Sequence, residues 1–133
     1  MVVEGTVIEG RQLGRRLGFP TANIEPESGG EVPEAGVYAA VAEIGGRRYA
    51  AVSNWGTNPS VGGCRPRLET HLLDFRGELY GRRIRVELLR RIRGERRFAT
   101  LEELRRQIEA DCRQVRTMFA AGTNETMTDK LKK

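Results

Sequence analysis

The fold is decided by the stretch VYAAVAEIGGRRYAAVS, which spans residues 37–53. Its two arms are rich in β-branched, aromatic and small apolar residues, and the dipeptide Gly45-Gly46 lies between them. Two consecutive glycines tolerate the positive φ angles that both central residues of a type I′ turn require. The stretch therefore predicts a β-hairpin with strands over residues 37–44 and 47–53.

Further strands are predicted on both sides of this hairpin. Residues 2–8 begin with the alternation that is typical of a strand, and in residues 83–89 the apolar Ile84, Val86 and Leu88 alternate with charged side chains. One face of the latter strand is therefore expected to be in water. The other segments are a strand over residues 68–75, a turn over residues 76–81, and a surface loop over residues 25–36.

The hydrophobic period changes after Thr100. Apolar residues recur there at spacings of three, four and seven, which is the stripe of an amphipathic helix. Thr100 as N-cap and Glu103 three residues later form a capping box, and Gly122 is suited to end the helix. We therefore expect one domain over residues 1–121 and a polar tail over residues 122–133. The stripe consists of Leu101, Leu104, Ile108, Val115 and Met118.

The composition fits one compact, mainly β domain. The chain has 133 residues, of which 38% are hydrophobic, 31% are charged and 16 residues are glycine. Short antiparallel strands followed by one helix predict a closed or nearly closed barrel, because closure removes exposed strand edges. The sequence has no run of about 18 apolar residues, so no membrane segment is predicted. Cys64 and Cys112 lie far apart and indicate neither a disulfide framework nor a zinc site, so we expect a cytoplasmic protein.

The positive charge predicts a surface that attracts anions. The net charge is +5, and arginines crowd into residues 82–97. Nucleic acid, anionic lipid and phosphorylated small molecules are all candidates, and a solvated strand face would look the same. A nucleic-acid-binding barrel usually offers several aromatic stacking platforms, whereas aromatic residues make up 6% here and Phe98 alone is close to the arginine cluster.

The segment GRQLGRRLGFPTAN, residues 10–23, is the first that carries chemistry. Its glycines would let backbone N–H groups close on phosphate oxygens, and its arginines add charged donors. The segment is neither a Walker A loop nor a dinucleotide fingerprint, because the glycine spacing differs and no Gly-Lys-Ser/Thr follows. An anion-binding loop and a flexible loop with solvated arginines therefore both fit the spacing.

Thr21 and Asn23 follow the rigid Phe19-Pro20 step. Pro20 favours an extended chain, in which Thr21 and Asn23 point to the same side. A hydroxyl and an amide oxygen side by side suit an Mg²⁺ ion that is held mainly by substrate phosphates and water. A local turn in which these side chains cap the loop backbone is the alternative.

The segment RLETHLLDF, residues 67–75, offers a candidate base. A carboxylate on a mainly apolar strand is costly unless it is paired or functional, so Glu69 fits the group that accepts a hydroxyl proton in phosphoryl transfer. A rim salt bridge to an arginine is the alternative, and we expect His71 to be structural. On a strand, Glu69, His71, Leu73 and Phe75 would share one face, and Thr70, Leu72 and Asp74 the other.

Taken together, these motifs resemble the riboflavin kinase family, which occurs alone in eukaryotes and as the C-terminal half of bacterial bifunctional FAD synthetases. The resemblance runs from about residue 3 to residue 119. Several linked motifs in the right order are more specific than any one of them. The motifs are LGFPTAN (17–23), GVY (36–38), VSNWGTNP (52–59), ETHLLDF (69–75), LYG (79–81) and RGERRF (93–98).

The resemblance implies a fold and an activity. The fold is a six-stranded antiparallel Greek-key (split) barrel with a C-terminal α-helix packed against it. The enzyme would transfer the γ-phosphate of ATP to the 5′-hydroxyl of riboflavin, giving FMN and ADP. The reaction would depend on Mg²⁺, with Zn²⁺ or Mn²⁺ as alternative metals.

The resemblance also implies roles for individual residues. Glu69 would be the catalytic base, and Thr21 and Asn23 would bind the metal. The flavin loop would contact riboflavin through Arg93, Arg96 and Phe98. The nucleotide-contacting positions would be Gly10, Arg15, Thr21, Asn23, Leu72, Asp74 and Tyr80.

Some features depart from the family's pattern. Trp55, Gly94 and Arg96 replace the usual residues, and these changes bear on the stiffness of the flavin loop more than on catalysis. Because no adenylyltransferase half precedes Met1, we expect a stand-alone kinase or an excised domain that does not make FAD by itself. No membrane or nucleic-acid partner is expected. The alternative functions are a flavin-binding module without turnover and a basic nucleic-acid-binding barrel.

Overall fold

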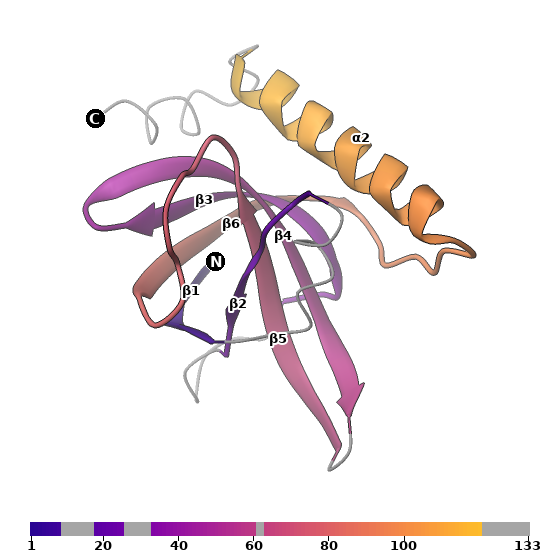
Figure 1. Ribbon diagram of the computed structural model, residues 1–133, viewed down its shortest axis with the longest axis horizontal. Coiled ribbons are helices and arrows are strands. Elements are labelled where there is room, and N and C mark those ends of the chain that lie inside the picture. The colour runs from indigo at the N-terminus through magenta and orange to yellow at the C-terminus, as the bar shows by residue number, and fades with distance from the viewer. Residues whose placement is uncertain (9–17, 26–32, 61–62, 121–133) are drawn as a thin grey trace.

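The computed structural model describes residues 1–8, 18–25, 33–60 and 63–120, and gives the side chains of all of these except residues 57–66. Six strands precede a long C-terminal helix (Figure 1). The elements are β1 (Val2–Ile8), β2 (Ala22–Ile24), β3 (Gly36–Ile44), β4 (Arg47–Ser60), β5 (Gly63–Leu72), β6 (Arg83–Arg93) and α2 (Leu101–Ala120).

The strands form a closed barrel in the order β1-β2-β5-β4-β3-β6, and every neighbouring pair is antiparallel. Strands β3, β4 and β5 follow one another as hairpins, and β6 returns to lie beside β3, which is the Greek-key arrangement. The predicted closed six-stranded Greek-key barrel is therefore confirmed.

Strand β1 closes the barrel because it pairs on both of its edges. Val3 lies opposite Val86 of β6, and Val7 lies opposite Ile24 of β2. Gly5 makes this junction possible, since a Cβ atom at that position would stand 2.8 Å from the Glu25 carbonyl oxygen. A side chain there would have to push β1 and β2 apart.

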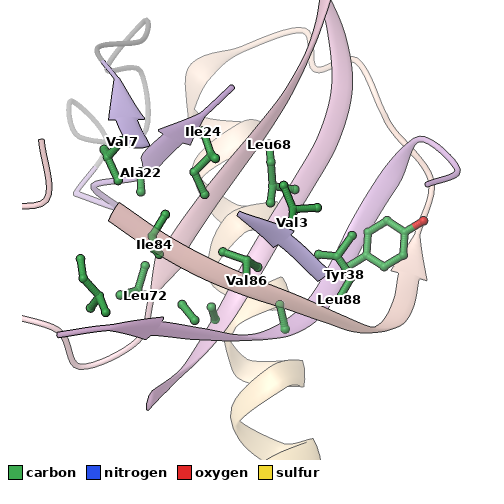
Figure 2. Packing of buried hydrophobic residues seen from close by; sticks show 14 of the residues in the cluster. Val3, Val7, Ala22, Ile24, Tyr38, Leu68, Leu72, Ile84, Val86 and Leu88 are labelled. Atoms are coloured by element: carbon green, nitrogen blue, oxygen red, sulfur yellow. The ribbon is translucent and has the colours of Figure 1, made fainter. Parts of the chain in front are cut away.

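Alternate residues of each strand fill the barrel interior. The core cluster draws side chains from all six strands. Figure 2 shows the labelled ones converging, with the Tyr38 hydroxyl at one end. That hydroxyl donates a hydrogen bond of 2.6 Å to the Glu34 carbonyl oxygen, so its polar group is satisfied. The labelled residues of this core are Val3, Val7, Ala22, Ile24, Tyr38, Leu68, Leu72, Ile84, Val86 and Leu88.

A polar pair sits within this apolar interior. Ser53 of β4 and Thr70 of β5 lie directly opposite each other and are fully buried. Their hydroxyl oxygens are 2.8 Å apart and share a hydrogen bond. Each hydroxyl therefore has a hydrogen-bond partner although it is buried away from water.

Helix α2 covers one wall of the barrel from outside, as Figure 1 shows. Val115, Met118 and Phe119 of the helix share a hydrophobic cluster with Ala39 and Val41, the outward-facing residues of β3, and the helix contacts β4. The shared cluster explains why β3 is buried on both faces. Within the described residues, no helix is both long and apolar enough to cross a lipid bilayer.

Within the predicted capping box at the start of α2, the N-cap Thr100 is confirmed, whereas the Glu103 side chain bonds one residue earlier than a capping box requires. Thr100 Oγ1 accepts a hydrogen bond of 3.1 Å from the Glu103 backbone N–H, and the Glu103 carboxylate accepts one of 3.0 Å from the Ala99 backbone N–H. The bond to Thr100 satisfies a backbone donor that the first helical turn leaves without a partner. The predicted stop at Gly122 and the tail over residues 122–133 lie outside the described residues.

The predicted hairpin about Gly45-Gly46 and the strand over residues 2–8 are confirmed, but the strands predicted over residues 47–53 and 83–89 extend to Ser60 and Arg93. Residues 22–24 form a short strand that was expected only as extended chain. The strand predicted over residues 68–75 ends at Leu72. Leu73 turns outward into the cluster beneath α2, and Asp74 has a φ of 61°, so Asp74 does not continue the face of Thr70 and Leu72.

Candidate active site

Two pockets lie side by side on the barrel and share a wall. The Asp74 pocket, of about 390 Å³, is lined by Asp74 and residues of β2 and the β5–β6 connection. The Glu69 pocket, of about 610 Å³, is lined by Glu69 and residues of β4, the β6–α2 connection and α2. Thr21 and His71 line both pockets, so a ligand in either pocket would lie next to them.

A row of polar residues crosses three strands on the outer face of the barrel. Glu69 of β5 lies opposite Asn23 of β2 on one side and opposite Asn54 of β4 on the other. Directly opposed residues of antiparallel strands project to the same face. The neighbouring Thr70 points into the core, so Asn23, Glu69 and Asn54 point outward. Glu69 and Asn54 line the Glu69 pocket, whereas Asn23 lines the Asp74 pocket.

Asn23 has the properties of a ligand-binding residue. Its side chain is 4% exposed, yet its Oδ1 atom has no hydrogen-bond partner among the described residues. A buried carbonyl oxygen without a partner costs about 1–3 kcal/mol, which a bound cation or donor would offset. Thr21 lines the same pocket. The two neutral oxygens therefore fit a Mg²⁺ ion that takes its other ligands from phosphate and water.

The described residues contain no group of three or more His, Cys, Asp or Glu side chains that could hold a metal ion. A zinc-type cage within this part of the chain is therefore not the arrangement that the structure offers. An ion beside Thr21 and Asn23 would depend on oxygen ligands that the substrate brings.

His71 holds in place the two residues that precede Thr21. Its Nδ1 atom is 2.8 Å from the Pro20 carbonyl oxygen, and its ring meets the Phe19 ring edge to face, with centroids 5.7 Å apart. These contacts tie the Phe19-Pro20 step to β5. The expectation that His71 is structural agrees with these contacts, which place it in the wall between the two pockets.

Asp74 is held in the wall of its pocket by α2. Arg116 of the helix donates two hydrogen bonds, of 2.9 and 3.0 Å, to the two carboxylate oxygens of Asp74. This hydrogen bonding keeps the pKa of Asp74 below its ordinary value. Leu72 and Tyr80 line the same pocket, Leu72 as part of the core and Tyr80 with 57% of its surface exposed.

The far wall of the Glu69 pocket is a network of charged and polar groups. Arg93 donates hydrogen bonds of 2.9 and 2.8 Å to the two carboxylate oxygens of Asp111. Arg96 donates a bond of 2.7 Å to Gln107 Oε1, and its guanidinium carbon lies 5.2 Å from the centroid of the Phe98 ring. The wall therefore combines a flat aromatic surface with fixed cationic groups.

The backbone of β4 also contacts this wall. The Glu95 carboxylate lies against Gly56, where a Cβ atom would collide with Glu95 Oε1. A side chain at position 56 would displace the Glu95 carboxylate, which is the end of a flexible and exposed side chain.

The structure brings the predicted site residues into two groups. Thr21, Asn23, Leu72, Asp74 and Tyr80, predicted to contact the nucleotide, all line the Asp74 pocket. Glu69, the predicted base, and Arg93, Arg96 and Phe98, the predicted flavin contacts, all line the Glu69 pocket. Gly10 and Arg15 lie outside the described residues.

Sequence reasoning did not select Asn54 or Asp111. Asn54 lies in the motif VSNWGTNP, and its place opposite Glu69 depends on strand register. Asp111 is a polar residue three positions after Ile108 of the helical stripe, and no local signal indicates that Arg93 is its partner.

Comparisons with known proteins identify relatives of the chain. The family model "Flavokinase: Riboflavin kinase" matches residues 1–119. The bifunctional riboflavin kinase/FMN adenylyltransferase of Escherichia coli (strain K12) is 47% identical over 118 residues, which are 88% of this chain and 37% of that protein. The chain thus spans little more than a third of that relative's length.

Solved structures share the fold. The crystal structure of riboflavin kinase from Trypanosoma brucei matches with a TM-score of 0.65 and 20% identity. The match covers 99% of this chain and 85% of the Trypanosoma brucei chain. A protein of Streptococcus pneumoniae, named as a macrolide-efflux protein, has a TM-score of 0.81 and 33% identity, over 86% of this chain and 38% of its own.

The matching family model and the relative from Escherichia coli are both named for riboflavin kinase, which fits the kinase interpretation. The family match covers all six strands and nearly the whole of α2. The chain belongs to the riboflavin kinase family.

Proposed function

We propose that the chain is an ATP:riboflavin 5′-phosphotransferase, which moves the γ-phosphate of ATP onto riboflavin to give FMN and ADP. The observation that carries this proposal is the pair of adjoining pockets that share Thr21 and His71. Phosphoryl transfer between two substrates requires the donor and the acceptor to meet in line, and catalysis then rests on positioning and charge stabilisation.

The Asp74 pocket suits the nucleotide. Thr21 and Asn23 offer oxygen ligands at the end of this pocket that adjoins the Glu69 pocket. A Mg²⁺ ion bound there together with the phosphates would neutralise charge that develops on the transferred group. Thr21 and Asn23 would orient the phosphates, while Tyr80 and Leu79 offer apolar surface for the remainder of the nucleotide.

The Glu69 pocket suits riboflavin. Phe19, Val37, Val52 and Phe98 give it apolar surface for a flat ring system. Glu69 would accept the proton of the 5′-hydroxyl as that oxygen attacks phosphorus. Its position opposite Asn23, on the neighbouring strand, puts its carboxylate near the wall where the two substrates would meet.

An assay of product formation tests the proposal. The purified chain is incubated with riboflavin, ATP and Mg²⁺, and FMN is separated from riboflavin by chromatography. FMN is expected only when both substrates are present. Lumiflavin, which keeps the ring system but has no 5′-hydroxyl, should bind and remain unchanged. No FMN with Mg²⁺, Zn²⁺ or Mn²⁺ would overturn the proposal.

A further inference from the structure

Arg93 and Asp111 form an ion pair that is largely withdrawn from water. Their side chains are 19% and 4% exposed, and both carboxylate oxygens accept from the guanidinium. Arg93 donates a third bond, of 3.0 Å, to the Gly94 carbonyl oxygen. Arg93 is the last residue of β6, so these bonds fix the point where the chain leaves the barrel and enters the wall of the Glu69 pocket.

Asp111 also acts on the other end of that wall. It accepts a hydrogen bond of 3.0 Å from Gln107 Nε2, and Gln107 Oε1 in turn accepts from Arg96, whose guanidinium lies over Phe98. One buried carboxylate is therefore bonded directly to Arg93 and, through Gln107, to Arg96. Removing its charge would loosen residues 93–98 at both ends.

We propose that Asp111 is a positioning residue for the acceptor pocket, which acts through Arg93 and Gln107 to hold residues 93–98 in the shape that binds the flavin ring. This assignment rests on the proposed function for the identity of the ligand. In this proposal Arg93 has a structural role, because its hydrogen bonds go to Asp111 and Gly94. Arg96 and Phe98 are then the residues that contact the flavin ring.

A second ion pair on the same helix provides a matched control. Arg116, five positions after Asp111, also donates two hydrogen bonds to one carboxylate, that of Asp74, but this pair is exposed and lies at the Asp74 pocket. Both pairs tie α2 to the barrel. If such pairs only fastened the helix, breaking either would lower stability and alter both substrate affinities alike.

The experiment compares Asp111→Asn with Arg116→Gln. The first change keeps the shape of the side chain and removes its charge, so we expect the KM for riboflavin to rise about 10-fold or more, with the KM for ATP within about twofold of the wild type. Arg116→Gln should leave the KM for riboflavin unchanged. Thermal unfolding of both variants establishes that each is folded at the assay temperature.

Gln107→Ala is the second variant, because it breaks the link to Arg96 and leaves the ion pair in place. It should raise the KM for riboflavin by a smaller factor and leave the KM for ATP unchanged. If Asp111→Asn does not fold, this variant decides. Equal increases in both KM values, or a wild-type KM for riboflavin in a folded Asp111→Asn or Gln107→Ala protein, would overturn the proposal.

Riboflavin binding without ATP separates this inference from the proposed function. The quenching of riboflavin fluorescence on titration with protein gives the Kd directly. A weaker Kd in Asp111→Asn supports the role of Asp111 even if the wild type makes no FMN, whereas FMN formation with an unchanged Kd overturns the role of Asp111 alone.

Discussion

Asn23 and Glu69 lie directly opposite each other on β2 and β5, yet each lines a different pocket. The hydrogen-bonded pairing of these two strands therefore fixes the separation between the proposed metal and phosphate side and the proposed acceptor side. Because the same pair of strands positions both residues, a change to one side chain should alter the binding or reaction of one substrate and leave the position of the other substrate unchanged.

Glu69→Gln should abolish most of the turnover and leave the protein folded. The amide keeps the size of the side chain but cannot accept the hydroxyl proton, and general bases typically contribute about 10²–10⁴-fold to a rate. The kcat for FMN formation should fall by a factor in this range, while riboflavin binding persists. Glu43→Gln, the same chemical change at an ion pair with Arg48 on β4, is the control. Near-normal turnover in Glu69→Gln would remove Glu69 from the mechanism.

Asn23→Leu should separate stability from function. Leucine has the branched shape of asparagine and removes a buried oxygen that has no partner among the described residues, so the free energy of unfolding should stay equal or increase. The KM for ATP should rise at least about 10-fold if Asn23 binds the metal and phosphates. Urea denaturation and steady-state kinetics test the two parts. A clear loss of stability would mean that Asn23 Oδ1 has a partner within the protein.

Thr100→Ala should lower the free energy of unfolding by about 0.5–2 kcal/mol, because the Glu103 backbone N–H loses its acceptor at the start of α2. Thr117→Ala is the matched control, since Thr117 is exposed within the same helix and alanine favours helix. Chemical denaturation of both proteins measures the difference. An equal effect at the two positions would contradict a capping role for Thr100.

Cys112 should make stability depend on alkaline pH. Burial, and then the negative charge of Asp111, raise the pKa of the Cys112 thiol from 9.0 to about 11. The folded state therefore keeps its proton when the unfolded state has lost it, so this contribution is full below pH 9.0 and is lost as the pH rises toward about 11.

Unfolding free energies at pH 8 and pH 10 test this for the wild type and for Cys112→Ala. Between pH 8 and pH 10 the titration of other groups should change the unfolding free energy of both proteins equally, and the wild type should lose an additional amount that is due to the thiol. Equal losses would show that the thiol has the same pKa in both states.

Local patterns in the sequence were enough to predict the hairpin and the helix. The turn at Gly45-Gly46 and the N-cap bond from Glu103 to Thr100 each depend on residues that are neighbours in the chain. By contrast, β2 has three residues, which is too short for any period to register. Its strand character comes from pairing with β1 and β5, which are distant in sequence.

The candidate site shows the same division. Linked motifs identified Thr21, Asn23 and Glu69 as candidates, because their residue types and order are specific to a family. Register and packing decided the rest. Asn54 faces Glu69 only because β4 and β5 pair in one register, and Asp111 meets Arg93 only because α2 lies against the outer wall of the barrel.

The double pairing of β1 has a consequence for how the protein is made. Strand β1, the first strand of the barrel to be synthesised, must wait for β6, since Val3 pairs with Val86 near the end of the barrel sequence. Contacts so distant in sequence slow folding, because the entropy of closing a long loop opposes them. Until β6 emerges, the hairpin of β3 and β4 can form, but both outer edges of the growing sheet stay open. Nascent chains stalled before β6 should therefore be the ones that chaperones and proteases recognise.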